Sequence, residues 1–461
     1  MIDSRDVQAG DVFFALSQPD YRNNGFNGEF EDATKYVVAA LENGAAAAVV
    51  RRDRYAEHEA GLRDHRSRLI LVDDCIAAFQ RLAAAVYRSW NKPVVGITGS
   101  AGKTSAKELT AHLIASHGLK VLKNVKNFNN GLGLPLTVLK LLKDASYDAA
   151  VLEMGMSTPM NEIRKLTSIT PPDVAVELNV LPVHLEHLGT IENIQKAKAE
   201  LVEGLKPGGT AVLNADDDRV MAMAELTVGP VITYGLGREA DVTAREISFE
   251  RFGETRFELS MFGETASVVF PLNGRHNIMN ALAAGAAASV FGMSVGEIAA
   301  SLSAVEPPPQ RGEVLRFAAG FTVINDSYNS NPDALLSMVD TLVEGSANAS
   351  RRIVIAGEML ELGPEAAGVH RATGREAAAR GIDILIGVRG FASELVEGAR
   401  EAGLAAAEFA EDSDAAAIRA AELVRPGDVV LVKGSRGVRT ERVIERLLAD
   451  FELEGPHHAA A

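Results

Sequence analysis

Cysteine, tryptophan and long apolar runs are scarce in this sequence. Cys75 is the only cysteine and Trp90 the only tryptophan among 461 residues, and aromatic residues make up 5% of the chain. A single cysteine can form no intramolecular disulfide and no cysteine-based metal cluster, which excludes a disulfide-stapled secreted fold. The chain also has no apolar run of about eighteen residues that could span a bilayer, and its N-terminus has no basic-then-apolar signal pattern. These absences predict a soluble protein of the cytoplasm.

Positive charge is the scarcer sign. The chain has 46 Lys and Arg residues against 62 Asp and Glu residues, a formal net charge of −16. An acidic molecule repels the phosphate backbone of nucleic acids and anionic membranes, so we expect neither as a partner. Nucleotide binding is not excluded, because a few basic side chains, backbone N–H groups and a divalent cation can neutralise phosphates locally.

The rest of the composition is typical of a globular protein, with 47% hydrophobic and 23% charged residues. At about 150 residues per domain, the length allows about three domains. Because strand-length apolar runs alternate with helical periodicity from Val94 onward, we predict an α/β fold with parallel sheets. The predicted domains are a small N-terminal α/β domain at 1–92, a central P-loop-type domain at 93–309 and a C-terminal Rossmann-like domain at 310–461. Pro307-Pro308-Pro309, which can continue neither a helix nor a central strand, marks the second boundary.

The expected elements follow from apolar runs and turn residues. Strands are expected at Val12–Ala15, Ala47–Val50 and Leu69–Val72, then at Val94–Thr98, Ala149–Glu153, Val174–Asn179 and Thr210–Asn214, and finally at Thr322–Asn325, Arg352–Ala356, Asp383–Gly387 and Asp428–Lys433. Helices are expected at Lys103–His117, Ile191–Leu205 and Asn277–Phe291. Short alternating segments between 241 and 271 predict an antiparallel extension.

The most informative stretch runs from 94 to 105 and contains T-G-S-A-G-K-T-S after an apolar strand. Glycines let backbone N–H groups point at phosphate oxygens, and the start of the following helix favours anions. Ile97 stands where the strict phosphate-loop pattern has its first glycine, so the loop is a variant. We interpret it as a nucleotide-phosphate site, with Lys103 on the phosphates and Thr104 on Mg²⁺, rather than an ordinary turn. Its expected residues are Gly99, Ser100, Gly102, Lys103, Thr104 and Ser105.

Further motifs follow in a fixed order along the chain. They are N-F-N-N-G-L-G-L-P-L-T at 127–137, E-M-G-M at 153–156, H-L-E-H-L-G-T at 184–190, K-A-K-A-E at 196–200, N-A-D-D at 214–217, G-R-H-N at 274–277, D-S-Y-N-S-N-P at 326–332, G-E-M-L-E-L-G at 357–363 and V-K-G-S-R at 432–436. Together with the phosphate loop they resemble the Mur ligase family, ATP-dependent ligases that join an amino acid or peptide to a carboxylate. The chain departs from the family in its short N-terminus, and in Glu358, Asn325 and Leu181-Pro182.

The Asn-rich loop is most similar to that of the family members that add D-alanyl-D-alanine to UDP-N-acetylmuramoyl-tripeptide. This resemblance implies an acyl-phosphate mechanism in peptidoglycan precursor synthesis, a step of cell-wall biogenesis on which cell shape and division depend. It implies ATP and Mg²⁺, with two metal sites. We also expect a monomer. Other family members, which add the third residue or resemble folylpolyglutamate synthases, remain alternatives. A non-catalytic nucleotide-binding scaffold is another alternative. A Rossmann dehydrogenase ranks last, because the expected first turns of this chain lack the G-x-G-x-x-G motif that such an enzyme requires.

The resemblance implies catalytic roles for Lys103, Glu153, His184 and Lys198, and metal binding by Thr104, Glu153, His184 and Lys198. Glu153 also follows a buried strand at the edge where parallel sheets bind ligands, which independently suits Mg²⁺. The resemblance also implies that Lys198 is carbamylated. The alternative interpretation of Lys198 is an exposed helical lysine that pairs with Glu200 or Glu203.

The remaining expected site residues also come from the resemblance. It implies that His276, Asn277 and Asn280 contact adenine, Arg311 the nucleotide phosphates and Asp326 the ribose. It implies that Ser4 and Arg5 contact the uridine diphosphate, and that Asn127, Asn129, Asn130 and Thr137 face the sugar-peptide. The incoming dipeptide would meet Tyr328, Asn329, Asn331, Lys433, Ser435 and Arg436. Local capping and turn chemistry are alternative explanations for these asparagines and serines.

Overall fold

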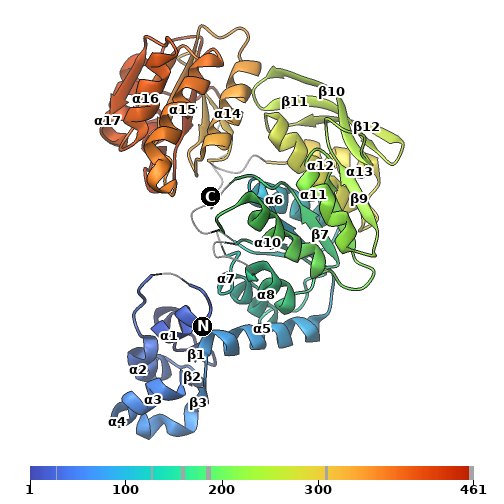
Figure 1. Ribbon diagram of the computed structural model, residues 1–461, viewed down its shortest axis with the longest axis vertical. Coiled ribbons are helices and arrows are strands. Elements are labelled where there is room, and N and C mark those ends of the chain that lie inside the picture. The colour runs from blue at the N-terminus through green and yellow to red at the C-terminus, as the bar shows by residue number, and fades with distance from the viewer. Residues whose placement is uncertain (27, 126–127, 157–160, 183–187, 307–309, 456–461) are drawn as a thin grey trace. The chain divides into compact units, whose positions relative to one another are not determined.

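The computed structural model describes residues 1–26, 28–125, 128–156, 161–182, 188–306 and 310–455. The chain forms two compact units, Met1–Ile232 and Thr233–Ala461. Figure 1 shows three regions of sheet with helices packed on them, which confirms the predicted α/β class. The predicted domain boundaries at 92 and 309 stay predictions, and Pro307–Pro309 lie outside the described residues. Within the described ranges, no helix has the length and apolar character needed to cross a membrane.

The N-terminal region has a three-stranded parallel sheet in the order β1-β2-β3. The strands are β1 (Val12–Phe14), β2 (Ala47–Arg51) and β3 (Leu69–Val72), within a residue of the predicted ones. The helices are α1 (Gln18–Asn23), α2 (Val37–Glu42), α3 (Arg52–Glu57), α4 (Glu59–Leu62) and α5 (Cys75–Trp90). The long helix α5 begins where the Asp74 side chain accepts from the Ala77 N–H, and it ends at Asn91 in a left-handed conformation. It packs on α7 (Gly133–Val138) and α8 (Glu162–Ile169) of the next region (Figure 1).

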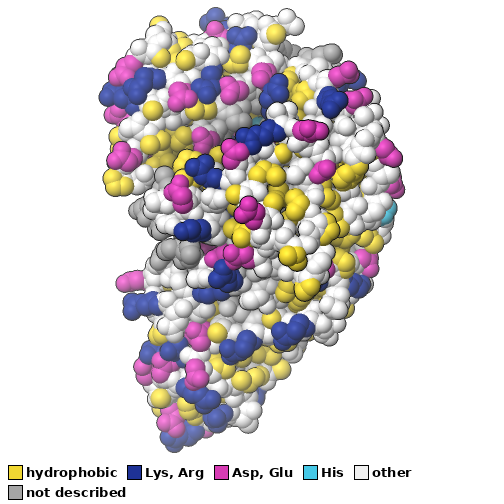
Figure 2. Space-filling view, turned by 45° about the vertical axis from the view of Figure 1, so that its right-hand side comes forward, with side chains coloured by type: hydrophobic (Ala, Val, Ile, Leu, Met, Phe, Trp, Pro, Cys, Tyr) yellow, Lys and Arg dark blue, Asp and Glu magenta, His cyan; other side chains and the backbone are white. Residues whose placement is uncertain are grey.

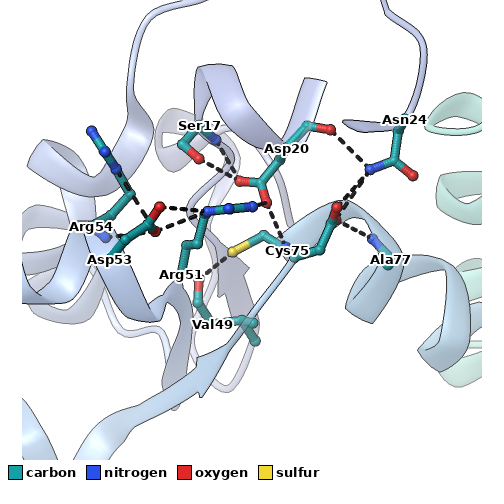
Figure 3. A network of polar contacts seen from close by, with 10 residues as sticks. Ser17, Asp20, Asn24, Val49, Arg51, Asp53, Arg54, Cys75 and Ala77 are labelled. Carbon is teal, nitrogen blue, oxygen red and sulfur yellow. Dashed lines mark hydrogen bonds and ion pairs between the residues drawn. The ribbon is translucent and has the colours of Figure 1, made fainter. Parts of the chain in front are cut away.

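A buried carboxylate ties this N-terminal sheet to α5 (Figure 3). Asp20 is fully buried and accepts from the N–H and hydroxyl of Ser17 at 2.9 and 2.6 Å and from the N–H of Cys75 at 2.8 Å. Nη1 of Arg51 lies 3.4 Å from Oδ1 of Asp20, the same oxygen that accepts from Cys75. Burial, followed by the nearby Asp20 charge, raises the pKa of the Cys75 thiol. The single cysteine is therefore structural and unreactive.

Replacing Asp20 with alanine is expected to cost about 3 kcal/mol of local stability, because it leaves Arg51 and the N–H groups of Ser17 and Cys75 without their buried acceptor. Hydrogen exchange of the backbone amides in β1, β2 and the start of α5 measures this loss. Asp53→Ala is the matched control, since Asp53 also pairs with Arg51 at 2.8 Å but its side chain is 45% exposed. Its effect should stay below about 1 kcal/mol. Equal protection in both variants would contradict the assignment.

The second region of the first unit is a parallel sheet in the order β8-β7-β4-β6-β5. Its strands are β4 (Val94–Thr98), β5 (Val121–Lys123), β6 (Ala149–Glu153), β7 (Val174–Glu177) and β8 (Thr210–Asn214). Its helices are α6 (Lys103–Ser116), α7 (Gly133–Val138), α8 (Glu162–Ile169), α10 (Ile191–Glu203) and α11 (Asp218–Met221). Every residue of β4, β6, β7 and β8 is buried, which explains why continuous apolar runs predicted them. β7 ends two residues before the predicted strand, and α6 and α10 end one and two residues early.

The second unit begins within β9 and continues into an antiparallel meander of β10, β11 and β12. The strands are β9 (Val231–Tyr234), β10 (Val242–Arg251), β11 (Glu254–Met261) and β12 (Glu264–Phe270), and β10, β11 and β12 pair antiparallel as predicted for 241–271. Two helices follow, α12 (Arg275–Ser289) and α13 (Val295–Ser303). α12 begins two residues before the predicted helix and ends two residues before its predicted end.

The C-terminal region is a six-stranded sheet in the order β13-β14-β18-β15-β16-β17. The strands are β13 (Glu313–Arg316), β14 (Thr322–Asp326), β15 (Arg351–Gly357), β16 (Ile384–Val388), β17 (Ala407–Ala410) and β18 (Asp428–Lys433), all parallel except β13. The helices are α14 (Pro332–Glu344), α15 (Ala366–Ala379), α16 (Ala392–Glu401), α17 (Ser413–Leu423) and α18 (Glu441–Asp450). One apolar core lies under α14, α15 and α16, and another lies under α17 and α18. The sheet is therefore covered on both faces, as the Rossmann-like prediction requires.

Charged side chains of both signs are interspersed on the face of the molecule in Figure 2. The excess of acidic residues is not gathered into one patch on that face. Exposed ion pairs of the described residues include Arg375 with Glu401 and Lys120 with Asp144. Such exposed pairs add little stability.

Candidate active site

The phosphate loop follows β4 and leads into α6, as predicted. Gly102 precedes α6 with φ +83, a left-handed conformation that favours glycine. A Cβ on Gly99 would lie 2.7 Å from Cβ of Leu178, so only glycine fits there. The first N–H groups of α6 have no partner within the helix and are available to an anion.

The end of β7 holds this loop in place. The Ser100 N–H donates to the Asn179 carbonyl at 3.0 Å, and the Ala101 N–H donates to Asn179 Oδ1 at 2.8 Å. The Ser100 hydroxyl accepts from the Leu181 N–H at 2.9 Å and donates to the Leu181 carbonyl at 3.1 Å. The loop is therefore pre-organised by a segment about 80 residues away in sequence, in which Asn179 is a residue that sequence reasoning missed.

Lys103, Thr104 and Glu153 meet at the start of α6. Lys103 Nζ folds back to donate to the Gly99 carbonyl at 2.8 Å, and burial lowers its pKa while the Glu153 charge raises it. The Thr104 hydroxyl donates to Glu153 Oε2 at 2.8 Å, and Asn129 Nδ2 donates to Oε1 at 2.8 Å. Glu153 is only 4% exposed. A carboxylate and a hydroxyl beside a helix N-terminus fit Mg²⁺ that also binds nucleotide phosphates.

No group of three His, Cys, Asp or Glu side chains that could hold a metal ion occurs in the part of the chain that the structure describes. His184, expected at a metal, lies outside the described residues. The described oxygen donors, Thr104 and Glu153, therefore fit one magnesium ion completed by phosphate oxygens and water.

Lys198 is 2% exposed and faces the sheet from α10. Leu201, one turn along the same helical face, packs on Gly96 of β4, where a Cβ would lie 2.8 Å from Leu201 Cδ1. Burial first, and then the charge of Lys103, lower the pKa of Lys198 to about 7, while Glu177 acts in the opposite direction. This lysine is thus poised to be a neutral amine near neutral pH.

The exposed-lysine alternative for Lys198 is wrong. Glu200 accepts from the N–H groups of Asn161 and Arg164 at 2.7 and 3.0 Å, and Glu203 pairs with the Arg164 side chain at 2.5 Å. Both carboxylates are therefore engaged elsewhere, and Lys198 lies on the buried face of α10.

Glu177, the last residue of β7, is a site residue that sequence reasoning missed. It is fully buried, and burial raises its pKa well above the ordinary value while Lys198 lowers it. Glu177 lies in register with Thr98 of the neighbouring strand β4. Side chains two residues apart on a strand share a face, so Thr98 lies on the same face of the sheet as Gly96, which faces α10. Glu177 therefore also lies on the face covered by α10. A glutamate closing an apolar strand, V-A-V-E, was the available signal.

The described side chains of the Asn-rich loop contact either Glu153 or the start of α7. Asn127 lies outside the described residues, and the Asn129 side chain donates to the Glu153 carboxylate. Asn130 Oδ1 accepts from the N–H groups of Leu132 and Gly133 at 3.1 and 2.9 Å, at the start of α7. Thr137 is fully buried and its hydroxyl donates to the Gly133 carbonyl at 3.1 Å. Their substrate roles stay predictions.

The N-terminal candidates lie on the surface. Ser4 and Arg5 form a short 3₁₀ turn after Asp3, whose side chain accepts from the Arg5 N–H. The Arg5 guanidinium is paired with the Asp3 carboxylate at 2.6 Å and is 87% exposed. An anion could therefore reach it from solvent, and its role toward uridine diphosphate stays a prediction.

In the second unit, the carboxyl ends of β14 and β18 bring together residues from two predicted groups. Asp326 and Lys433 lie in register and form an ion pair at 2.5 Å. Lys433 Nζ also donates to the Asn329 carbonyl at 2.9 Å. The Arg311 guanidinium lies over the ring of Tyr328, 4.0 Å from its centroid. Because the chain leaves β14 and β18 toward opposite faces of the sheet, this edge is where doubly wound sheets bind ligands.

His276 at the start of α12 belongs to the same cluster. Burial lowers its pKa to about 4, with Asp326 raising it and Lys433 lowering it, so the imidazole is neutral at pH 7. Its Nδ1 lies 3.1 Å from the Ser337 hydroxyl. On the same helix, Asn277 donates to the Asn273 carbonyl at 2.7 Å, the local contact that the capping alternative describes, and Asn280 is 7% exposed.

The remaining candidates at this edge are partly engaged within the chain. Asn331 caps α14 by accepting from the Ala334 N–H at 2.8 Å. The Ser435 hydroxyl accepts from the Leu360 N–H at 3.0 Å and donates to the Ser330 carbonyl at 3.3 Å, and Arg436 is 62% exposed beside Glu441. The hydroxyl of Ser330, which sequence reasoning did not assign, is buried without a hydrogen-bond partner among the described residues. It is available to a ligand.

Comparison with known proteins identifies relatives over most of the chain. The model described as "Mur ligase middle domain" matches residues 97–288, and that described as "Mur ligase, glutamate ligase domain" matches residues 310–436. The protein named UDP-N-acetylmuramoyl-tripeptide–D-alanyl-D-alanine ligase in Bacillus subtilis is 35% identical over 336 residues, which cover 73% of this chain and 70% of the relative. The protein of the same name in Escherichia coli is 33% identical over 389 residues, covering 84% and 80%.

Solved structures agree with these relatives. MurF from Acinetobacter baumannii superposes with a TM-score of 0.82 at 27% identity, over 97% of this chain and 93% of that one. The MurF ligase from Thermotoga maritima in complex with ADP gives a TM-score of 0.82 at 27% identity, over 98% and 97%. The resemblance seen in the motifs is thereby confirmed, and the chain belongs to the Mur ligase family.

Proposed function

We propose that this chain is the ATP-dependent ligase that adds D-alanyl-D-alanine to UDP-N-acetylmuramoyl-tripeptide in the synthesis of peptidoglycan precursors. One observation carries the proposal. The carboxylate of Glu153 is held on one side by Thr104 of the phosphate loop and on the other by Asn129 of the Asn-rich loop. A nucleotide-phosphate site and the segment typical of this branch of the family therefore share one carboxylate, in a chain whose relatives of that name are 33 and 35% identical.

Amide formation from a carboxylate needs activation. The terminal carboxylate of the tripeptide attacks the γ-phosphorus of ATP, ADP leaves, and an acyl phosphate forms. The amine of the dipeptide then attacks the acyl carbon, the tetrahedral intermediate expels phosphate, and the amine loses a proton. The protein mainly positions the reactants and neutralises charge. Lys103 and the N–H groups that begin α6 would bind the β- and γ-phosphates, and Thr104 and Glu153 would hold Mg²⁺, which would supply charge neutralisation.

We further propose a second metal position that involves Lys198 as a carbamate together with His184. Carbamylation joins CO₂ to a neutral amine with loss of one proton, so it needs a lysine that is deprotonated near pH 7. The pKa of about 7 that burial gives to Lys198 supports this proposal. His184 enters it from the sequence resemblance alone.

The second unit is proposed to bind the rest of the nucleotide and the acceptor. Its nucleotide residues are His276, Asn277, Asn280, Arg311 and Asp326, and its dipeptide residues are Tyr328, Asn329, Asn331, Lys433, Ser435 and Arg436. The ion pair of Asp326 with Lys433 links the two groups. Ser4, Arg5, Asn127, Asn129, Asn130 and Thr137 are proposed to contact the UDP-sugar peptide. Cytoplasmic location and the monomeric state stay predictions.

The test is phosphate release with ATP, Mg²⁺ and UDP-N-acetylmuramoyl-tripeptide, with and without D-alanyl-D-alanine, followed by mass detection of the product. Release that depends on the dipeptide and yields the pentapeptide is expected. Parallel reactions with L-glutamate or a diamino acid as the acceptor test the other family activities. Equal release with and without any acceptor, or ligation of a single amino acid instead, would overturn the proposal.

A further inference from the structure

Lys107 is a charged residue buried behind the phosphate loop. It lies one turn after Lys103 on α6 and is 1% exposed. Its Nζ donates to the Asn124 carbonyl at 2.7 Å and lies 3.0 Å from Glu108 Oε1. Burying an ammonium group is costly, and a methionine of similar length would fill the space without that cost. The proposed mechanism leaves this charge without a use.

Asn124 follows β5 directly and is 1% exposed. Its side-chain amide binds both backbone groups of Glu153: the Glu153 N–H donates to Oδ1 at 2.9 Å, and Nδ2 donates to the Glu153 carbonyl at 2.9 Å. Nδ2 also donates to the Phe128 carbonyl at 3.0 Å. The pairing of β5 with β6 ends at Lys123 and Val151, so the Asn124 side chain replaces backbone pairing where Glu153 needs it.

We propose that Lys107 and Asn124 are positioning residues for Glu153. Lys107 fixes the backbone of Asn124, and the Asn124 amide fixes the backbone of Glu153, so that the carboxylate is directed at Thr104 and the cation. This inference rests on the proposed function only in that Glu153 holds a divalent cation beside the nucleotide. Groups that orient metal ligands in this way typically change metal affinity by about 10- to 100-fold when removed.

The test compares Lys107→Met and Asn124→Ser with the wild type. Electron paramagnetic resonance measures Mn²⁺ affinity in the presence of ADP, and the ligase reaction is titrated with Mg²⁺. Both variants are expected to bind Mn²⁺ about tenfold more weakly and to need correspondingly more Mg²⁺, while kcat at saturating Mg²⁺ stays within about threefold. Lys123→Met is the matched control, because Lys123 also pairs with Glu108 but is exposed, and its Mn²⁺ affinity should be unchanged.

Several outcomes would overturn the proposal. Unchanged Mn²⁺ affinity in soluble Lys107→Met and Asn124→Ser proteins would show a purely structural role, as would a loss of kcat that excess Mg²⁺ does not restore. If Lys107→Met does not fold, Asn124→Ser carries the test, and Lys107→Arg, which keeps a donor to the Asn124 carbonyl, should bind Mn²⁺ like the wild type. If the wild type binds Mn²⁺ with ADP but forms no pentapeptide, the proposed function fails, while the Mn²⁺ affinities still decide between a positioning and a structural role.

Discussion

Replacing Lys103 with alanine is expected to lower kcat by at least about a hundredfold while leaving the protein folded. The ammonium group is the one side-chain cation that the described structure places within the phosphate loop, where it donates to the Gly99 carbonyl. Removing a single pre-organised group that stabilises transition-state charge typically costs about 100- to 1000-fold. Because burial lowers the pKa of Lys103, the folded state holds its charge at a cost, so its removal should not lower the melting temperature.

The measurement is steady-state phosphate release and pentapeptide formation over a range of ATP concentrations. Lys103→Arg keeps the charge but has a larger, planar head group. It should recover only part of the loss, since the compact ammonium donates to the carbonyls of Gly99 and Ser100 within a tight loop. Circular dichroism and the melting temperature control for folding. A Lys103→Ala protein with more than about a tenth of the wild-type kcat would contradict the assignment of Lys103 to the phosphates.

Replacing Lys198 with alanine should have an effect of similar size, for a different reason. If a carbamate on this buried lysine helps to hold a metal, its loss removes an acid that no other described residue on α10 supplies at that place. Short-chain carboxylic acids, added at millimolar concentrations, should enter the vacated space and restore part of the activity. Lys196→Ala, two residues earlier on the exposed face of α10, is the matched control and should behave as the wild type. A Lys198→Ala enzyme with near-normal kcat would refute the role.

The same residue predicts a pH dependence with a definite sign. Its pKa of about 7 lies well below the ordinary lysine value of about 10.5, so the amine is mostly neutral at pH 8 and mostly protonated at pH 6. Carbamylation and activity should therefore fall as the pH drops through about 7. The buried ammonium destabilises the fold below that pH, and this penalty is relieved as the pH rises toward 10.5. Lys198→Met should accordingly raise the melting temperature at pH 6 more than at pH 9; an equal shift at both would contradict the low pKa.

Local sequence patterns were sufficient for the framework. β4, β6, β8 and β18 have the predicted bounds because each is a continuous apolar run buried on both faces, a pattern that needs no knowledge of neighbours. The phosphate loop was equally local, since glycines, the helix start and Lys103 lie within eight residues. The strands that were missed, β5, β9, β13 and β17, are three or four residues long and mix polar with apolar side chains, so no run distinguishes them.

The sequence by itself thus determined the fold class, the long buried strands of the parallel sheets, the phosphate loop and the membership of the Mur ligase family. Tertiary structure alone decided the contacts between distant segments: Asn129 and Asn124 on Glu153, Asn179 on the phosphate loop, and Asp326 on Lys433. It also decided that Lys198 is buried, since K-A-K-A-E is compatible with either face of a helix. The physical reason is that backbone preference acts between residues close in the chain, whereas burial and hydrogen bonding at a sheet edge depend on which strands lie side by side.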